Sequence, residues 1–324
     1  MRPTWRISTP AAAGAPDPVM SAIRLGSRGS ALALTQAGLV RNALEALGEE
    51  VELIPITTSG DERPGGVTAP DPGTGPVPED KARFTKEIEE ALLAGRIDLA
   101  VHSAKDVPGD LPDGLSIVGV PARADARDAI CGAASLEDVP EGAAVGTASL
   151  RRQAQLLALR PDLEIRELRG NVDTRLRKLH EDGYDAIVLA CAGLERLGRA
   201  GEGSPIPSAE MVPAAGQGCL ALEARTGDAH PVEVAAALTD REALTRLTAE
   251  RALVTAIGAD CNTPIGAHAQ LDGQFLRLSA FVGMPDGSHW IRDVIETDAQ
   301  EASEAGHAIA QRLLAAGAGE LLSP

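Results

Sequence analysis

The sequence predicts an α/β protein in which two α/β domains lie around a cleft and a smaller α+β domain follows. Strand-like and helix-like segments follow one another from Ile23 onward, and their alternation after Pro121 is typical of βαβ units with parallel strands. The 324 residues suffice for two or three domains of ordinary size. Beyond residue 239 the pattern changes to one long helix, three strands and a final helix.

The first domain is expected to comprise residues 22–121 together with 217–238. The spacing of its apolar residues predicts strands at 23–26, 51–58, 97–103, 115–120 and 219–224, and helices at 30–47 and 84–95. The strand at 219–224 would return to this domain from later in the chain. Residues 61–80 hold five Pro and four Gly, which predicts an irregular segment, either a functional lid or a disordered loop.

The second domain is expected to span residues 122–216 and the third residues 239–324. Strands at 128–132, 143–147, 164–168 and 185–191 and helices at 149–159 and 171–180 are predicted for the second. The third begins with a helix over 240–257 that has Asp240 at its start and Gly258 after its end. Strands at 267–271, 275–283 and 289–296 and a helix over 298–316 complete it.

The composition excludes several classes of protein. Hydrophobic residues make up 44% and charged residues 24%, the balance of a soluble globular chain, and no apolar run reaches the roughly 18 residues of a membrane span. Aromatic residues make up only 2%, so base-stacking surfaces are not expected. The net charge of −17 disfavours non-specific binding to DNA. Neither a nucleic acid nor a membrane is therefore expected as a partner.

The cysteines indicate a reducing compartment and no metal site. Cys131, Cys191, Cys219 and Cys261 form no CxxC pair and no zinc-like spacing with the six histidines. Cys191 and Cys219 lie in apolar runs and are expected in the core. Residues 1–20 lack the apolar centre of a secretory signal, so residues 1–21 are expected to be a disordered tail. We therefore expect a cytoplasmic protein.

Two turns between strand and helix in the first domain carry charged residues. Ligands of such sheets bind beyond the carboxyl ends of strands, near helix N-termini. In the first turn, Arg28 and Ser30 could bind an anion, or Ser30 could simply cap the helix beside a surface arginine. In the second, Lys105 and Asp106 follow an apolar strand. Asp106 could stabilise a cation or move a proton; the alternative is that the loop holds only a salt bridge and that His102 is simply buried.

The second domain carries an arginine-rich segment. Thr147 and Ser149 can cap the helix over 149–159, whereas Arg151 and Arg152 lie in its first turn, where cations oppose the helix dipole. This placement predicts an anion between the two arginines. From Arg151 to Lys178 there are eight bases and four acids, which predicts a ligand with several negative groups; the alternative is a solvated basic face.

The loop of residues 258–268 contains Cys261, which is a candidate nucleophile or attachment point because it lies outside the apolar runs. Asp260 beside it would raise the pKa of the thiol and oppose formation of the thiolate. A purely structural cysteine remains the alternative at this point.

Six strings in order resemble the porphobilinogen deaminase (hydroxymethylbilane synthase) family: HSAKDVP, GTASLRRQAQL, LRGNVDTRL, YDAIVLACAGLERLG, PAAGQG and DCNTPIG. The resemblance runs from about Ile23 to the end of the chain. It implies a transferase of tetrapyrrole and haem biosynthesis that joins four porphobilinogen molecules head to tail, each losing ammonia, and releases hydroxymethylbilane. The primer would be a dipyrromethane cofactor joined by a thioether to Cys261. The implied fold is two domains like periplasmic binding proteins and a third that carries the cofactor cysteine.

The resemblance also implies roles for individual residues. Asp106 would be catalytic, and Lys81 would be a lid contact, although Asp80–Arg83 replace the Gly-Gly-Lys-Gly that the family often has. Asp260 stands where the family commonly has Gly. The implied cofactor and substrate contacts are Arg28, Ser30, Lys105, Thr147, Ser149, Arg151, Arg152, Arg169, Arg175, Arg196 and Gln217. A monomer is expected. The rival hypothesis is a solute-binding module that holds a polyanion with arginines.

Overall fold

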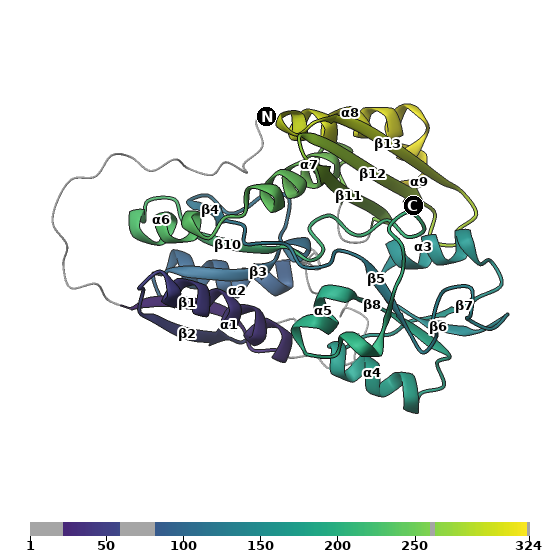
Figure 1. Ribbon diagram of the computed structural model, residues 1–324, viewed down its shortest axis with the longest axis horizontal. Helices are drawn as coiled ribbons and strands as arrows, with labels where there is room; N and C mark the ends of the chain where they lie inside the picture. Colours follow the sequence, from purple (N-terminus) through teal and green to yellow (C-terminus); the bar gives the residue numbers. More distant parts are fainter. Residues whose placement is uncertain (1–21, 59–81, 260–262, 323–324) are drawn as a thin grey trace, which may run out of the picture. The chain divides into compact units, whose positions relative to one another are not determined.

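The computed structural model describes residues 22–58, 82–259 and 263–322 (Figure 1). Contacts divide the chain into two units, Met1–Ala122 with Leu220–Asp240, and Arg123–Cys219 with Arg241–Pro324. The expected tail at 1–21 and the expected lid or loop at 61–80 lie outside the described residues. Within the described ranges, no helix is both long and apolar enough to cross a membrane.

The first unit contains a five-stranded sheet in the order β2-β1-β3-β10-β4. Its strands are β1 (Ile23–Arg28), β2 (Val51–Ile56), β3 (Leu99–Ser103), β4 (Leu115–Gly119) and β10 (Leu220–Arg225). Strand β1 is parallel to β2 and β3, but β10 is antiparallel to β3 and β4. The expected return of 219–224 to this sheet is confirmed, and β10 joins it antiparallel to both of its neighbours.

Helices cover both faces of this sheet. The helices are α1 (Ala31–Ala46), α2 (Ala82–Leu93) and α6 (Ala229–Ala237). Side chains alternate between the faces of a strand. Leu99 and Val101 of β3 therefore pack with α1 and α6, whereas Ala100 between them packs with α2. Ser30 caps α1 by accepting a hydrogen bond from the Ala33 backbone N–H, as its position before the apolar run predicts.

The second unit begins with another five-stranded sheet, in the order β7-β6-β8-β5-β9. Its strands are β5 (Asp128–Cys131), β6 (Ala144–Gly146), β7 (Glu164–Arg166), β8 (Ala186–Ala190) and β9 (Ser204–Pro205). Its helices are α3 (Leu150–Leu159), α4 (Val172–Glu181) and α5 (Cys191–Arg196). Strand β6 is parallel to β7 and β8, whereas β5 is antiparallel to β8 and β9. The parallel pairing expected for this domain is therefore confirmed for β6 and wrong for β5, and β9 is an addition to the predicted strands.

The rest of the second unit is a three-stranded antiparallel sheet with helices on one face. Its elements are α7 (Arg241–Ile257), β11 (Ile265–Asp272), β12 (Phe275–Gly283), β13 (Trp290–Asp298), the 3₁₀ turn Ala299–Glu301, α8 (Ala302–Ala315) and α9 (Ala318–Leu322). Helices α7 and α8 pack so closely that a Cβ atom on Gly306 would lie 2.5 Å from the Ala249 carbonyl oxygen. The predicted α/β class with a smaller α+β part at the C-terminus is confirmed.

The buried carboxylate of Glu250 joins this part to the segments before it. Its Oε1 lies 2.7 Å from Arg123 Nη1 and accepts the Ala269 backbone N–H over 2.8 Å. Its Oε2 accepts the Gly216 backbone N–H over 2.7 Å. Burial alone would raise the pKa of Glu250, but the guanidinium of Arg123 and the imidazole of His268 outweigh it and lower the pKa to about 2.

We predict that Glu250→Gln lowers the free energy of unfolding at pH 7 by about 3 kcal/mol, because it leaves the guanidinium of Arg123 buried without its carboxylate. The depressed pKa means that the ionised Glu250 stabilises the fold fully above its usual value of 4.5, and that this contribution is lost as the pH falls through about 2. The difference in unfolding free energy between Glu250→Gln and the unsubstituted protein should therefore become smaller as the pH falls from 4.5 to 2. Urea unfolding across that range measures it.

The matched control is Glu242→Gln, which removes an exposed ion pair with Arg246 on the same helix and should change stability by less than about 1 kcal/mol. If the loss of unfolding free energy in Glu250→Gln stays constant from pH 7 to pH 2.5, the stabilisation does not come from the ionised carboxylate of Glu250.

Candidate active site

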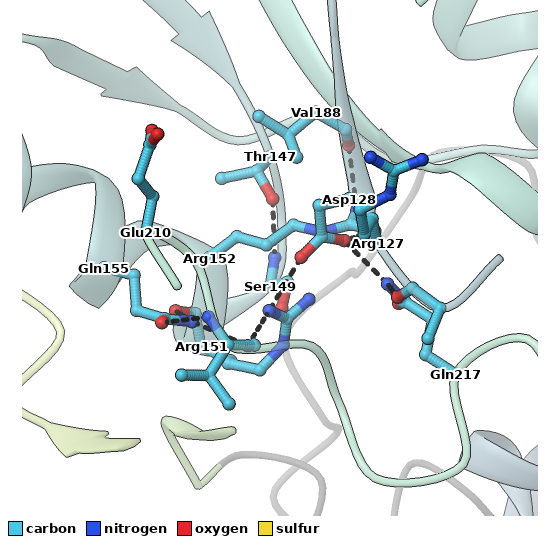
Figure 2. Close-up of polar contacts among 12 residues, drawn as sticks. Arg127, Asp128, Thr147, Ser149, Arg151, Arg152, Gln155, Val188, Glu210 and Gln217 are labelled. Carbon is cyan, nitrogen blue, oxygen red and sulfur yellow. Dashed lines mark hydrogen bonds and ion pairs between the residues drawn. The ribbon is translucent and has the colours of Figure 1, made fainter. Parts of the chain in front are cut away.

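An ion-paired cluster lies at the N-terminal end of α3 (Figure 2). Asp128 opens β5 and is fully buried, while Arg151 and Arg152, in the first turn of α3, are each 5% exposed. Arg151 Nη1 lies 2.8 Å from Asp128 Oδ2, and Arg152 Nη2 lies 2.8 Å from Asp128 Oδ1. Arg152 Nε donates to the same Oδ1 over 3.0 Å. The chain thus places its own carboxylate between the two arginines.

Both guanidinium groups are also anchored to backbone carbonyls. Arg151 Nη1 donates to the Val212 carbonyl over 2.7 Å, and Arg152 Nη1 donates to the Val188 carbonyl in β8 over 2.8 Å. Gln155, one turn further along α3, holds Val212 from both sides, because its Oε1 accepts the Val212 N–H and its Nε2 donates to the Val212 carbonyl. The orientation of the arginines is therefore fixed by the surrounding backbone.

Gln217 binds Asp128 directly, and Arg196 binds the residue that follows Gln217. Gln217 Nε2 donates to Asp128 Oδ1 over 2.9 Å and to the Ala126 carbonyl over 2.8 Å. Arg196 Nη2 donates to the carbonyl of the next residue, Gly218, over 2.8 Å. Four of the expected contact residues, Arg151, Arg152, Arg196 and Gln217, are thereby brought to one region of the second unit.

The electrostatics of the cluster favour an anionic ligand. Burial alone would raise the pKa of Asp128, but Arg151 and Arg152 hold it well below the usual range of an aspartate. Burial lowers the pKa of Arg151, although a guanidinium stays protonated at any physiological pH. Two guanidinium groups face one carboxylate, so the cluster carries one positive charge in excess. A buried excess charge is costly unless a counter-ion meets it.

The start of α3 differs from the predicted capping. Ser149 occupies the N-cap position, but its side chain makes no capping hydrogen bond. Instead, the Ser149 backbone N–H donates to Thr147 Oγ1 over 3.1 Å. The expectation that Ser149 caps the helix through its hydroxyl is therefore wrong, because the buried hydroxyl of Thr147 orders this turn.

Arg169 and Arg175 lie around Gly170, and their hydrogen bonds are local. Arg169 is exposed and its Nε lies 2.5 Å from Glu167 Oε1. Arg175 Nε donates to the Gly170 carbonyl over 2.7 Å. The partners in these two contacts, Glu167 and the Gly170 carbonyl, lie outside the buried cluster around Asp128.

The first unit places its expected residues at one edge of the sheet. Arg28 ends β1, and Lys105 and Asp106 form the short 3₁₀ turn that follows β3. Since β1 and β3 are neighbouring parallel strands, their carboxyl ends lie at the same edge. Ser30, at the N-cap of α1, belongs to the same edge. Lys105 and Asp106 are both half-buried.

His102 is a core residue. Its Nε2 lies 2.9 Å from Glu223 Oε2 in the neighbouring strand β10, and both side chains are almost fully buried. Burial and the charge of Glu223 raise the pKa of Glu89, which belongs to the adjacent helix α2. The fold therefore supports the alternative that His102 is a buried core residue.

The sequence analysis missed the buried acids of the molecule. Asp128, Glu223 and Glu250 are each 1% exposed or less. Asp128 and Glu223 are each the single charged residue of an apolar run, DAIC and LALEA, whereas Glu250 is followed directly by Arg251 in AERALV. A lone acid in such a run was the available signal, because a buried carboxylate needs a partner.

Three of the four cysteines are buried and unreactive in character. Burial raises the pKa of Cys131 to about 11 and the pKa values of Cys191 and Cys219 to about 12. The predicted core positions of Cys191 and Cys219 are confirmed. Lys81, Asp260 and Cys261 lie outside the described residues. Across 22–58, 82–259 and 263–322, no group of three acids, histidines or cysteines could hold a metal ion.

Two family models match the chain. The model for "Porphobilinogen deaminase, dipyromethane cofactor binding domain" matches residues 23–233. The model for "Porphobilinogen deaminase, C-terminal domain" matches residues 244–315. Together they span both units and include every element of the site described above.

Curated relatives agree with these models. The chain is 45% identical over 311 residues to a porphobilinogen deaminase of Roseiflexus castenholzii, covering 94% of this chain and 99% of the relative. It is 46% identical over 311 residues to one of Thermus thermophilus, with the same coverage of both chains. Among solved structures, a substrate-binding domain of Lactococcus lactis GlnP is similar at a TM-score of 0.40 and 12% identity, covering 76% of this chain and 94% of that one.

We predict that iodoacetamide at pH 8 leaves Cys131, Cys191 and Cys219 unmodified in the native protein, because burial suppresses their thiolates. Peptide mass mapping after a timed reaction measures modification at each position. The same reaction in urea is the control and should modify all three. Native modification at the rate of an exposed thiol would disprove their burial.

Proposed function

The chain belongs to the porphobilinogen deaminase family, and we propose that it joins four porphobilinogen molecules head to tail on a dipyrromethane primer. Each addition releases one ammonia, and water finally frees the linear tetrapyrrole hydroxymethylbilane for haem and porphyrin biosynthesis. The observation that carries the proposal, beside the family, is the buried cluster of Arg151, Arg152 and Asp128 with its one excess positive charge. In a chain of net charge −17, such a cluster suits a polycarboxylate.

The residues of the second unit fit the dipyrromethane cofactor. Each pyrrole ring carries an acetate and a propionate, and guanidinium groups bind carboxylates through charge-assisted hydrogen bonds. Arg151 and Arg152 offer a buried cation in excess, and the hydroxyl of Ser149 is not used in capping. When bound, the cofactor supplies the terminal pyrrole carbon to which the first substrate is added. Its proposed attachment point is the thiol of Cys261.

Asp106 is the proposed catalytic residue. Its carboxylate follows β3, at the sheet edge where ligands of α/β proteins bind. There it would stabilise positive charge on a pyrrole nitrogen and hold or accept a proton as ammonia leaves. Lys105, the preceding residue, would bind a ring carboxylate and orient the ring. Acid–base chemistry thus resides in the first unit, and the described arginine cluster in the second.

The remaining contacts are proposed from the family motifs and from where the fold places them. Arg28 and Ser30 lie at the same sheet edge as Asp106. Arg196 and Gln217 adjoin the Asp128 cluster. Thr147, Arg169 and Arg175 complete the set of carboxylate contacts, and Lys81 is a proposed lid contact.

We also propose three domains, a monomer and a cytoplasmic location. The boundaries are 22–121 with 217–238, 122–216, and 239–324, supported by the separate sheet within each range. The net charge of −17 argues against nucleic acid as a partner. A chain of 324 residues with four cysteines does not need a disulfide scaffold, which supports a reducing compartment.

We predict that the intact protein, expressed in a cell that makes porphobilinogen, exceeds its chain mass by two linked pyrrole units. Denaturing mass spectrometry measures the excess. Cys261→Ser should abolish it, whereas Cys191→Ala, the matched control at a buried core cysteine, should retain it. A bare chain mass for the unsubstituted protein would favour the solute-binding alternative.

We predict that Asp106→Asn folds normally but loses turnover by at least about 100-fold, the usual contribution of a general acid or base. Substrate consumption and ammonia release measure turnover, and circular dichroism checks the fold. Asp110→Asn, an exposed carboxylate in the same loop, is the control and should leave turnover within about twofold. An Asp106→Asn variant as fast as the unsubstituted enzyme would remove Asp106 from the mechanism.

A further inference from the structure

Asp128 contacts three of the proposed ligand-binding residues at once (Figure 2). It lies 2.8 Å from Arg151, 2.8 Å from Arg152 and 2.9 Å from the Gln217 amide. It is 0% exposed, so it contacts no solvent and has no surface of its own to offer a ligand. Asp128 can therefore affect the reaction only through Arg151, Arg152 and Gln217.

The contacts of Asp128 distinguish the two arginines. Every nitrogen of the Arg152 guanidinium has a partner inside the protein: Nε and Nη2 bind Asp128, and Nη1 binds the Val188 carbonyl. Arg151 uses only Nη1, which binds both Asp128 and the Val212 carbonyl. In the described part of the chain, Nε and Nη2 of Arg151 have no such partner. Asp128 therefore contacts Arg151 only at Nη1, which leaves Nε and Nη2 to donate hydrogen bonds to a ligand carboxylate.

Asp128 also sets the charge of the cluster. Without it, two buried guanidinium groups would lie side by side at a helix N-terminus, where both their mutual repulsion and the helix dipole disfavour them. With the carboxylate of Asp128 present, the cluster carries a single excess positive charge, which one ligand carboxylate neutralises. A growing chain that must later be released is better matched by such a site than by two uncompensated cations, because a stronger field would retain it.

We propose that Asp128 is a positioning residue, which fixes Arg151, Arg152 and Gln217 so that the cluster binds one carboxylate of the growing chain at a time. The inference rests on the proposed function, because it presumes that these three residues bind the cofactor and substrate. Asp128 itself touches neither.

Two substitutions test it. Asp128→Asn keeps the size of the side chain and removes its charge, and Asp128→Glu keeps the charge and shifts the carboxylate by one methylene group. We expect Asp128→Asn to raise the KM for porphobilinogen at least tenfold while kcat falls less, and Asp128→Glu to raise KM by a smaller factor. A merely structural role would reduce the amount of folded enzyme and hence the apparent kcat, and would leave KM unchanged.

Asp162→Asn is the matched control. Asp162 forms a pair of the same type with Arg160 at the surface of the same unit, so its loss should leave KM unchanged. If Asp128→Asn does not fold, Asp128→Glu alone decides the question. A folded variant of either kind with the KM of the unsubstituted enzyme overturns the proposal.

Parallel measurements on the unsubstituted protein separate this proposal from the proposed function. Denaturing mass spectrometry and turnover of porphobilinogen are recorded for it and for both variants. If the unsubstituted protein lacks both the pyrrole mass and turnover, the proposed function fails. If it has both and the variants share its KM, only the role of Asp128 fails.

Discussion

The ion pairs of Asp128 with Arg151 and Arg152 are the constraint on which the second unit depends. A guanidinium that is 5% exposed has lost most of its water, and two of them in one helix turn require a carboxylate nearby. Asp128 supplies it from the first residue of β5, which is antiparallel to β8. The position of β5, the start of α3 and the orientation of both arginines therefore depend on the same ion pairs.

The same principle recurs elsewhere in the fold. Glu250 of α7 pairs with Arg123 and also accepts two backbone N–H groups, so one carboxylate joins a helix, a strand and two connecting segments. Glu223 of β10 pairs with His102 of β3 at the antiparallel contact within the first sheet. Asp128, Glu223 and Glu250 each have a cationic or hydrogen-bonding partner that is distant in sequence. These acids fix how strands and helices meet, which apolar packing alone leaves less specific.

This arrangement also explains why a molecule with a net charge of −17 can bind a polyanion. The acids dominate the total charge, but at α3 one carboxylate faces two guanidinium groups in a buried setting. Charges there are screened less than on the surface. The local excess of one positive charge, rather than the total, is what a carboxylate-bearing ligand encounters. Asp106 and Lys105, for which we propose the acid–base and ring-orienting roles, lie in the turn after β3.

The sequence by itself determined the order and type of nearly all elements, because apolar periodicity and capping residues are local. The helix over 240–257, for example, is found at Arg241–Ile257. It also determined the family, through motifs that include Arg151, Arg152 and Asp106. Tertiary structure alone decided that β10 and β5 pair antiparallel, that Thr147 rather than Ser149 orders the start of α3, and that Asp128 is the anion between the arginines. Asp128 and Arg151 are 23 positions apart, and Gln217 is 89 positions from Asp128, so only the folded chain brings these side chains within hydrogen-bonding distance.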